Sequence, residues 1–193
     1  MSAAKRIKRI KYLGASTPYA WVIEPTHGCN LSCGHCSCAL DPLPKTYHFI
    51  EEETFTQALR IIARVAPTSR LDLALGGEPT LHPTLYNLLR IAHRVSPLTQ
   101  VQITTNGTML LKGKVKYSDL LSAGANIIYT DMYGDRSRYP VLAEESGYKW
   151  FKYYDPPPEA PSPWVYHGPD LKVIVLQEQP EHWPNSRKKA GLL

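Results

Sequence analysis

Short apolar runs alternate along this chain with longer stretches in which apolar residues recur every three or four positions. The short runs predict β-strands at residues 19–24, 71–77, 100–107, 125–131, 148–154 and 170–177. The longer stretches predict helices at residues 51–66, 82–95, 116–124 and 138–147. In the first of these, Phe55, Leu59 and Ile62 share one helical face. The pattern therefore predicts alternating strands and helices.

Strand and helix repeat at intervals of about 30 residues, and the strands are nearly continuous apolar runs, which favours a parallel sheet with helical crossovers. A closed eight-stranded barrel needs about 250 residues, whereas this chain has 193. We therefore expect an α/β fold, a partial (β/α)6 TIM-like barrel with parallel strands that is open on one side. A doubly wound sheet is the alternative that periodicity does not separate from it.

Composition limits the class of protein. The chain is 43% hydrophobic and 20% charged, which is typical of a globular domain and not of a disordered chain. We expect a basic extension at residues 1–17, a core at residues 18–178 and a tail at residues 179–193. No apolar run approaches the roughly 18 residues of a membrane span, and no apolar segment follows the basic start as in a secretory signal. These features predict a cytoplasmic protein that does not enter a membrane.

All four cysteines lie between residues 29 and 38, with the spacing Cys29-x3-Cys33-x2-Cys36 and then Cys38. Cysteines confined to one loop cannot form a disulfide framework, and thiolates are the ligands that zinc and iron–sulfur clusters prefer. A structural zinc site usually takes a second ligand pair from a distant segment, and this chain has no second cysteine pair. Three thiolates therefore suit a [4Fe–4S] cluster with one iron left open, and we expect Cys38 to be a free thiol. The alternative is a zinc knuckle with His27, His35 or Cys38 as its fourth ligand.

Three other distinctive loops also follow predicted strands. They read "GGEP" at residues 76–79, "TTNG" at residues 104–107 and "YTDMYG" at residues 129–134. The carboxyl ends of parallel strands meet at one edge of a sheet, where α/β proteins place their ligand sites. These loops and the cysteines therefore predict a single composite site.

These motifs carry a resemblance to a known family. "CNLSCGHC" is similar to the Cx3CxΦC signature (Φ, an aromatic ring) of the radical S-adenosylmethionine (radical SAM) superfamily, and the other three motifs follow in the family's order. The resemblance covers roughly residues 18–178 and matches the short form that lacks a cysteine-rich extension for auxiliary clusters. It implies a [4Fe–4S] cluster and SAM as cofactors. The cluster then cleaves SAM reductively to methionine and a 5′-deoxyadenosyl radical, which abstracts hydrogen from a substrate.

The resemblance also implies roles for individual residues. It makes Cys29, Cys33 and Cys36 the iron ligands, with the fourth iron holding SAM. The expected cofactor-binding residues are His35, Gly76, Gly77, Glu78, Thr105, Asn106, Thr130 and Asp131. Among them the GGE residues would meet the methionyl ammonium of SAM and the His35 backbone the adenine edge. Either Thr130 or Asp131 would contact the ribose, although "YTDMYG" departs from the commoner "SLDG" form.

Several of these residues also have ordinary structural explanations. Glu78 is an acid of the kind found at helix starts, Asn106-Gly107 is a common turn, and Asp131 suits a solvated loop. The glycines favour ligand binding, because backbone must approach closely where no side chain fits.

The substrate is predicted less directly. "IEPTHGCNLSC" is similar to enzymes that modify peptides and proteins, so we expect a peptide or protein substrate. A nucleotide- or tRNA-modifying radical SAM enzyme is the alternative, favoured by the basic termini. A non-catalytic zinc or iron–sulfur binding module is the alternative of another class. The expected partners are SAM and an external electron donor such as flavodoxin or ferredoxin.

Overall fold

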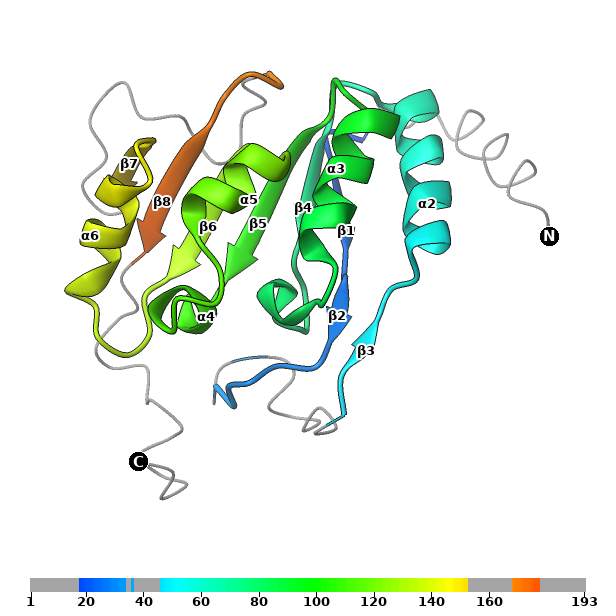
Figure 1. Cartoon of the computed structure of the whole chain (residues 1–193). Coiled ribbons are helices and arrows are strands. Elements are labelled where there is room, and N and C mark those ends of the chain that lie inside the picture. The colour runs from blue at the N-terminus through cyan, green and yellow to red at the C-terminus, as the bar shows by residue number, and fades with distance from the viewer. Residues whose placement is uncertain (1–17, 34–35, 37–45, 153–167, 178–193) are drawn as a thin grey trace.

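The computed structural model describes residues 18–33, 36, 46–152 and 168–177. Six strands form one parallel sheet in the order β1-β4-β5-β6-β8-β7 (Figure 1). Their bounds are β1 Ala20–Ile23, β4 Arg70–Leu73, β5 Gln100–Thr105, β6 Ile127–Asp131, β7 Lys149–Lys152 and β8 Val173–Gln177. Two short strands, β2 Thr26–His27 and β3 His48–Phe49, pair antiparallel as a separate ribbon.

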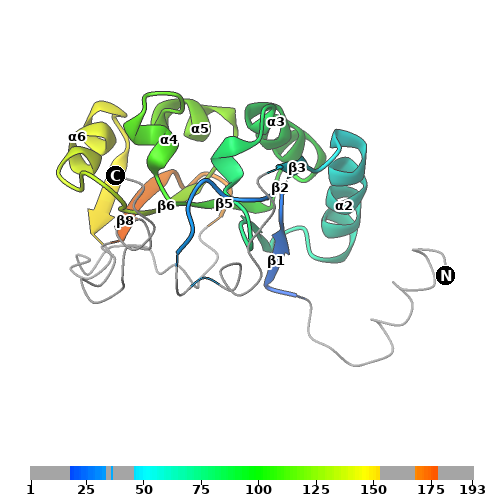
Figure 2. The same cartoon turned by 90° about the horizontal axis from the view of Figure 1, so that it is seen from below.

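Helices cover one face of this sheet, as the view onto its carboxyl edge shows (Figure 2). The four longer helices are α2 Glu52–Val65, α3 Leu85–Val95, α5 Tyr117–Ala123 and α6 Arg138–Glu145. Two short elements follow strand ends: the 3₁₀ turn η2 Pro79–Leu81 after β4, and α4 Thr108–Leu111 after β5. The opposite face of the sheet has no helix among the described residues.

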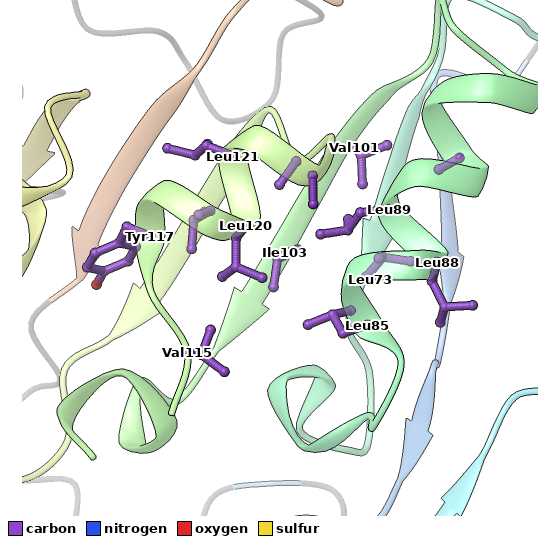
Figure 3. Packing of buried hydrophobic residues seen from close by; sticks show 14 of the residues in the cluster. Leu73, Leu85, Leu88, Leu89, Val101, Ile103, Val115, Tyr117, Leu120 and Leu121 are labelled. Carbon is purple, nitrogen blue, oxygen red and sulfur yellow. The ribbon is translucent and has the colours of Figure 1, made fainter. Parts of the chain in front are cut away.

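The main core lies between the sheet and this helical layer (Figure 3). Successive strand residues point to opposite faces, so alternate positions of each strand enter the core. On β4 and β5 these are Leu71, Leu73, Val101 and Ile103, and all of them are fully buried. They pack against leucines of α3 and α5, which include Leu88, Leu89, Leu120 and Leu121. This packing fixes the sheet and therefore the edge at which the loops meet.

The other face of the sheet changes character along its width. On β4 and β5 its residues are polar and include Arg70, Asp72 and Gln102. On β6 and β8 it carries a small apolar cluster of Ile127, Tyr129, Val173 and Val175. A polar strip therefore borders an apolar one on the face that the helices leave free.

The structure confirms the predicted α/β fold, a partial barrel of six parallel strands. Each predicted strand and helix is present, with bounds within three residues of those expected except that β4 ends at Leu73, four residues earlier than predicted. The β2–β3 ribbon, η2 and α4 were not predicted, and sequence order did not indicate that β8 lies between β6 and β7. The predicted terminal segments at residues 1–17 and 179–193 lie outside the described residues. None of the described helices is long and apolar enough to cross a membrane.

Candidate active site

The cysteine loop leaves β2 at the carboxyl edge of the sheet (Figure 1). Cys29, Cys33 and Cys36 are free and partly buried, and the Cys36 amide donates to the Cys33 carbonyl at 3.0 Å. Within the described parts of the chain, no three His, Cys, Asp or Glu side chains are already grouped as a metal site. His35 and Cys38 lie outside the described residues, so their predicted roles stay predictions.

Burial affects the protonation of Cys29 and Cys33. It raises the pKa of Cys29 to about 11. The Leu31 amide and the Asn106 side chain donate hydrogen bonds to the sulfur of Cys29, and these hydrogen bonds act to lower the pKa. Burial also raises the pKa of Cys33. A buried thiolate needs a compensating cation, and iron supplies that charge to soft sulfur ligands. Three half-buried thiols on one loop are therefore a donor set that fits a cluster bound through three cysteines.

The glycine loop after β4 packs directly on the backbone of the cysteine segment. A Cβ on Gly77 would lie 1.6 Å from the carbonyl oxygen of Thr26, so no other residue fits there without moving backbone. The Glu78 amide donates to the Gly28 carbonyl at 3.0 Å. The close approach inferred from "GGEP" is thus present, and it is an approach of the protein's own backbone. Contact of Gly76 and Gly77 with SAM stays a prediction.

Glu78 is only 2% exposed, and its carboxylate accepts four hydrogen bonds. The donors are the Thr80 amide at 2.9 Å, the Thr80 hydroxyl, the Thr105 hydroxyl at 2.6 Å and the Asn106 amide at 2.8 Å. Burial raises the pKa of this carboxyl, and the four donors oppose that effect. Both oxygens are therefore engaged inside the protein, where they tie the loop after β4 to the end of β5. The predicted contact of Glu78 with the methionyl ammonium would compete with these donors.

The "TTNG" turn is a connector between loops. Thr105 accepts from the Gly107 amide at 3.1 Å while it donates to Glu78. The side-chain nitrogen Nδ2 of Asn106 donates to the side-chain oxygen of Asn30 at 2.9 Å and to Cys29 Sγ at 3.5 Å. Gly107 adopts φ +69°, which suits the turn expected of Asn-Gly. Thr105 and Asn106 therefore organise the site, and their contact with the cofactor stays a prediction.

The end of β6 separates the two ribose candidates. Thr130 is fully buried, and its hydroxyl accepts from the Tyr117 hydroxyl at 2.9 Å on the helical side of the sheet. This hydroxyl is therefore already engaged within the protein. Asp131 is partly exposed at the carboxyl end of the same strand. Contact of Thr130 or Asp131 with the ribose stays a prediction.

Sequence analysis did not single out Tyr133. Its hydroxyl is hydrogen-bonded to the Cys33 thiol, with 3.5 Å between the oxygen and Sγ. The buried Tyr139 of α6 donates from its own hydroxyl to the Tyr133 carbonyl at 2.8 Å. Tyr133 belongs to the "YTDMYG" motif, but nothing in a loop of irregular structure indicates where such a side chain points.

Comparison with known proteins gives a consistent assignment. The sequence model of the family described as "Radical SAM superfamily" matches residues 23–150, more than half of the chain. Among curated proteins, the GTP 3′,8-cyclase of Chlorobaculum tepidum is 31% identical over 119 residues, 56% of this chain and 31% of that protein. The GTP 3′,8-cyclase of Stenotrophomonas maltophilia is 32% identical over 101 residues, 50% of this chain and 29% of that protein. The aligned part thus spans less than a third of the length of these relatives.

Solved structures show the same fold. A crystal structure of BtrN in complex with AdoMet and 2-DOIA has a TM-score of 0.55 at 16% identity, over 82% of this chain and 56% of that one. A structure of BtrN in an open conformation has a TM-score of 0.51 at 15% identity, over the same shares of the two chains. The resemblance inferred from the cysteine spacing is confirmed. The chain belongs to the radical SAM superfamily, a family of enzymes that use a [4Fe–4S] cluster and SAM.

Proposed function

We propose that this chain carries out the SAM-cleaving step of a radical SAM enzyme with one cluster held by Cys29, Cys33 and Cys36. The observation that carries the proposal is the position of these free thiols at the carboxyl edge of a parallel sheet, against a glycine loop with no room for a side chain. When bound, cluster and SAM supply reductive cleavage to methionine and a 5′-deoxyadenosyl radical, which removes a hydrogen atom from substrate. The electron comes from an external donor such as flavodoxin or ferredoxin. Thiolate ligands and such a donor support a cytoplasmic setting.

The residues around the loop divide this work. The backbone of Gly76 and Gly77 presents the SAM methionyl group to the open iron, and the Asp131 carboxylate accepts from the ribose hydroxyls. The loops are held in position by buried hydrogen bonds of Glu78, Thr105 and Thr130. In this proposal the backbone of the glycine loop contacts the SAM ammonium, and the Glu78 carboxylate does not.

A polar substrate is favoured by the polar side chains on the face of the sheet that no described helix covers. Asp72 on β4 lies opposite Gln102 on β5, and Thr104 is two residues further along β5 toward the carboxyl edge. These side chains offer hydrogen-bond donors and acceptors to a base edge or to a peptide group. The curated relatives are named for action on GTP, which supports a nucleotide as the first candidate. A peptide substrate, expected from the sequence around the cysteines, is the second.

Cluster chemistry is tested by anaerobic reconstitution. We expect a brown protein with about four irons per chain, and release of 5′-deoxyadenosine on addition of dithionite and SAM. The Cys33→Ala variant should lose the cluster, because two thiolates on this loop do not hold it. Stoichiometric zinc in the wild-type chain, with no 5′-deoxyadenosine, would overturn the proposal in favour of a zinc module.

Substrate class is tested with the reconstituted chain and a panel of nucleoside triphosphates and short peptides. The readout is 5′-deoxyadenosine formed above the rate without substrate, together with deuterium transferred into it from deuterated GTP. Stimulation and transfer with GTP support the nucleotide candidate. Stimulation by peptides alone would favour the second candidate.

A further inference from the structure

Two polar side chains from outside the cysteine loop reach the sulfur atoms of two different cluster ligands. Asn106 Nδ2 lies 3.5 Å from Cys29 Sγ, and the Tyr133 hydroxyl oxygen lies 3.5 Å from Cys33 Sγ. One comes from the turn after β5 and the other from the loop after β6, at sequence separations of 77 and 100 residues. Two neighbouring strands thus each deliver one side chain to the cysteine loop.

Groups that are not cluster ligands hold the Asn106 side chain and the backbone of Tyr133 in place. The side-chain oxygen of Asn106 accepts from the Thr108 amide at 3.0 Å and from the Thr108 hydroxyl at 2.7 Å, which fixes its NH₂ group toward the cysteine loop. The carbonyl of Tyr133 accepts from the hydroxyl of the fully buried Tyr139. These are constrained contacts, and they place a donor at each sulfur.

The direction of each hydrogen bond follows from the chemistry of the bound state. A cysteine sulfur bound to iron carries no proton, so it acts only as an acceptor. The Asn106 NH₂ already donates to Cys29. The Tyr133 hydroxyl, which accepts from the Cys33 thiol here, would turn its own proton to the sulfur. Both contacts therefore become hydrogen bonds from the protein to the cluster thiolates.

We propose that Asn106 and Tyr133 are positioning residues that set the reduction potential of the cluster through hydrogen bonds to the sulfurs of Cys29 and Cys33. The inference rests on the three-cysteine cluster of the proposed function. The reduced cluster carries one more negative charge than the oxidised one, so donors to its sulfurs stabilise the reduced form more strongly. Loss of a donor lowers the potential and makes the one-electron reduction by the external donor harder.

Tyr133→Phe tests the inference, because it removes one hydroxyl and keeps the ring. Tyr117→Phe is the matched control, since it removes a buried hydroxyl that bonds Thr130 and, within the described residues, forms no hydrogen bond with a cysteine. Both variants are reconstituted, and the potential is measured by redox titration monitored by electron paramagnetic resonance. In Tyr133→Phe we expect the reduced-to-oxidised ratio of the cluster at a fixed potential to fall about three- to tenfold. A tenfold fall corresponds to a reduction potential lowered by about 59 mV. The control should match the wild type.

Resonance Raman spectra give a second readout. A sulfur that accepts a hydrogen bond shows iron–sulfur stretching bands that shift between H₂O and D₂O, and we expect a smaller shift in Tyr133→Phe and in Asn106→Ala. Asn126→Ala is the control for the second variant, because Asn126 is also a buried side-chain amide, has three hydrogen bonds of its own and lies directly before β6.

The outcomes separate the two proposals. A four-iron cluster in Tyr133→Phe with the wild-type potential and the wild-type isotope shift overturns this inference and leaves the proposed function in place. A wild-type chain that takes up no four-iron cluster overturns both. A lowered potential in Tyr133→Phe, with the Tyr117→Phe control unchanged, supports the assignment.

Discussion

Replacement of Glu78 by alanine should destabilise the chain even when no cofactor is bound. The carboxylate is buried and accepts hydrogen bonds from two backbone amides and two threonine hydroxyls. Alanine removes the acceptor and leaves these donors in place. The loss of stability should therefore be measurable in the apo chain, whereas a defect in cofactor binding would appear only when the cofactor is present.

The size of the effect follows from those donors. A buried donor without an acceptor costs about 1–3 kcal/mol. The threonine hydroxyls can rotate, so only the amides of Thr80 and Asn106 are counted, which gives about 2–6 kcal/mol. Part of this is offset because the substitution also removes a desolvated carboxyl, whose pKa burial raises. We expect a net loss of about 2–3 kcal/mol in the free energy of unfolding.

Thermal unfolding of the apo chain, followed by circular dichroism, measures this loss. At about 2–4 °C per kcal/mol for a chain of this size, Glu78→Ala should lower the melting temperature by about 5–10 °C. Glu53→Ala is the control: its side chain is 71% exposed, and its polar partners among the described residues are Gln57 and Arg60 on the surface of α2. That variant should stay within about 0.5 kcal/mol of the wild type. Glu78→Gln keeps one acceptor oxygen and should fall between the two.

A melting temperature of Glu78→Ala within about 1 °C of the wild type would refute this reasoning. It would mean that the carboxylate does not hold the loops together. The side chain would then be free to contact the SAM ammonium, as the sequence alone suggests. Weakened SAM binding at full apo stability would be the signature of that role.

Three further changes test other parts of the structure. Gly77→Ala should destabilise the apo chain by about 3 kcal/mol or more in chemical denaturation, because the new Cβ would overlap a backbone oxygen of β2. Gly113→Ala is the control: its Cβ would enter open space, and the substitution should cost about 1 kcal/mol. Burial lowers the pKa of His82 in the folded chain, so the unfolded chain binds a proton at this histidine first as the pH falls. The free energy of unfolding should therefore fall as the pH drops from about 6.5 through the folded pKa. His82→Gln should remove this pH dependence in urea titrations. Arg70→Leu should cost about 3 kcal/mol, because it leaves the partly buried Asp72 carboxylate without its cation. The double variant with Asp72→Leu should recover most of the loss in thermal melts, and a double variant no more stable than the single would contradict this.

The sequence predicted the main elements because their apolar spacing is regular. The helix expected at residues 51–66 is α2 Glu52–Val65, and the strand expected at residues 125–131 is β6 Ile127–Asp131. The β2–β3 ribbon was missed because each strand has two residues, too few to establish a period. The position of β8 between β6 and β7 was missed because hydrophobic periodicity carries no information on which strands pair.

The location of the site was predictable, and the orientation of its side chains was not. Four motifs after parallel strands necessarily meet at one edge, and the structure places them there. That the Thr130 hydroxyl is bonded to Tyr117 depends on how α5 packs on β6, which the sequence does not show. That Glu78 turns inward depends on donors 27 and 28 residues away, which no local pattern reveals.

The placement of β8 has a consequence for the order in which the sheet is assembled. β7 precedes β8 in the chain, yet its ladder partner among the described strands is β8, with Lys149 opposite Val173. While the chain is being synthesised, β1, β4, β5 and β6 can join the sheet in the order in which they emerge, but β7 must wait for β8. Until then Trp150 and Phe151 lack the strand that joins them to the two hydrophobic clusters. We therefore expect β7 and β8 to join the sheet together and after the other four strands, with β8 completing the apolar strip beside Tyr129.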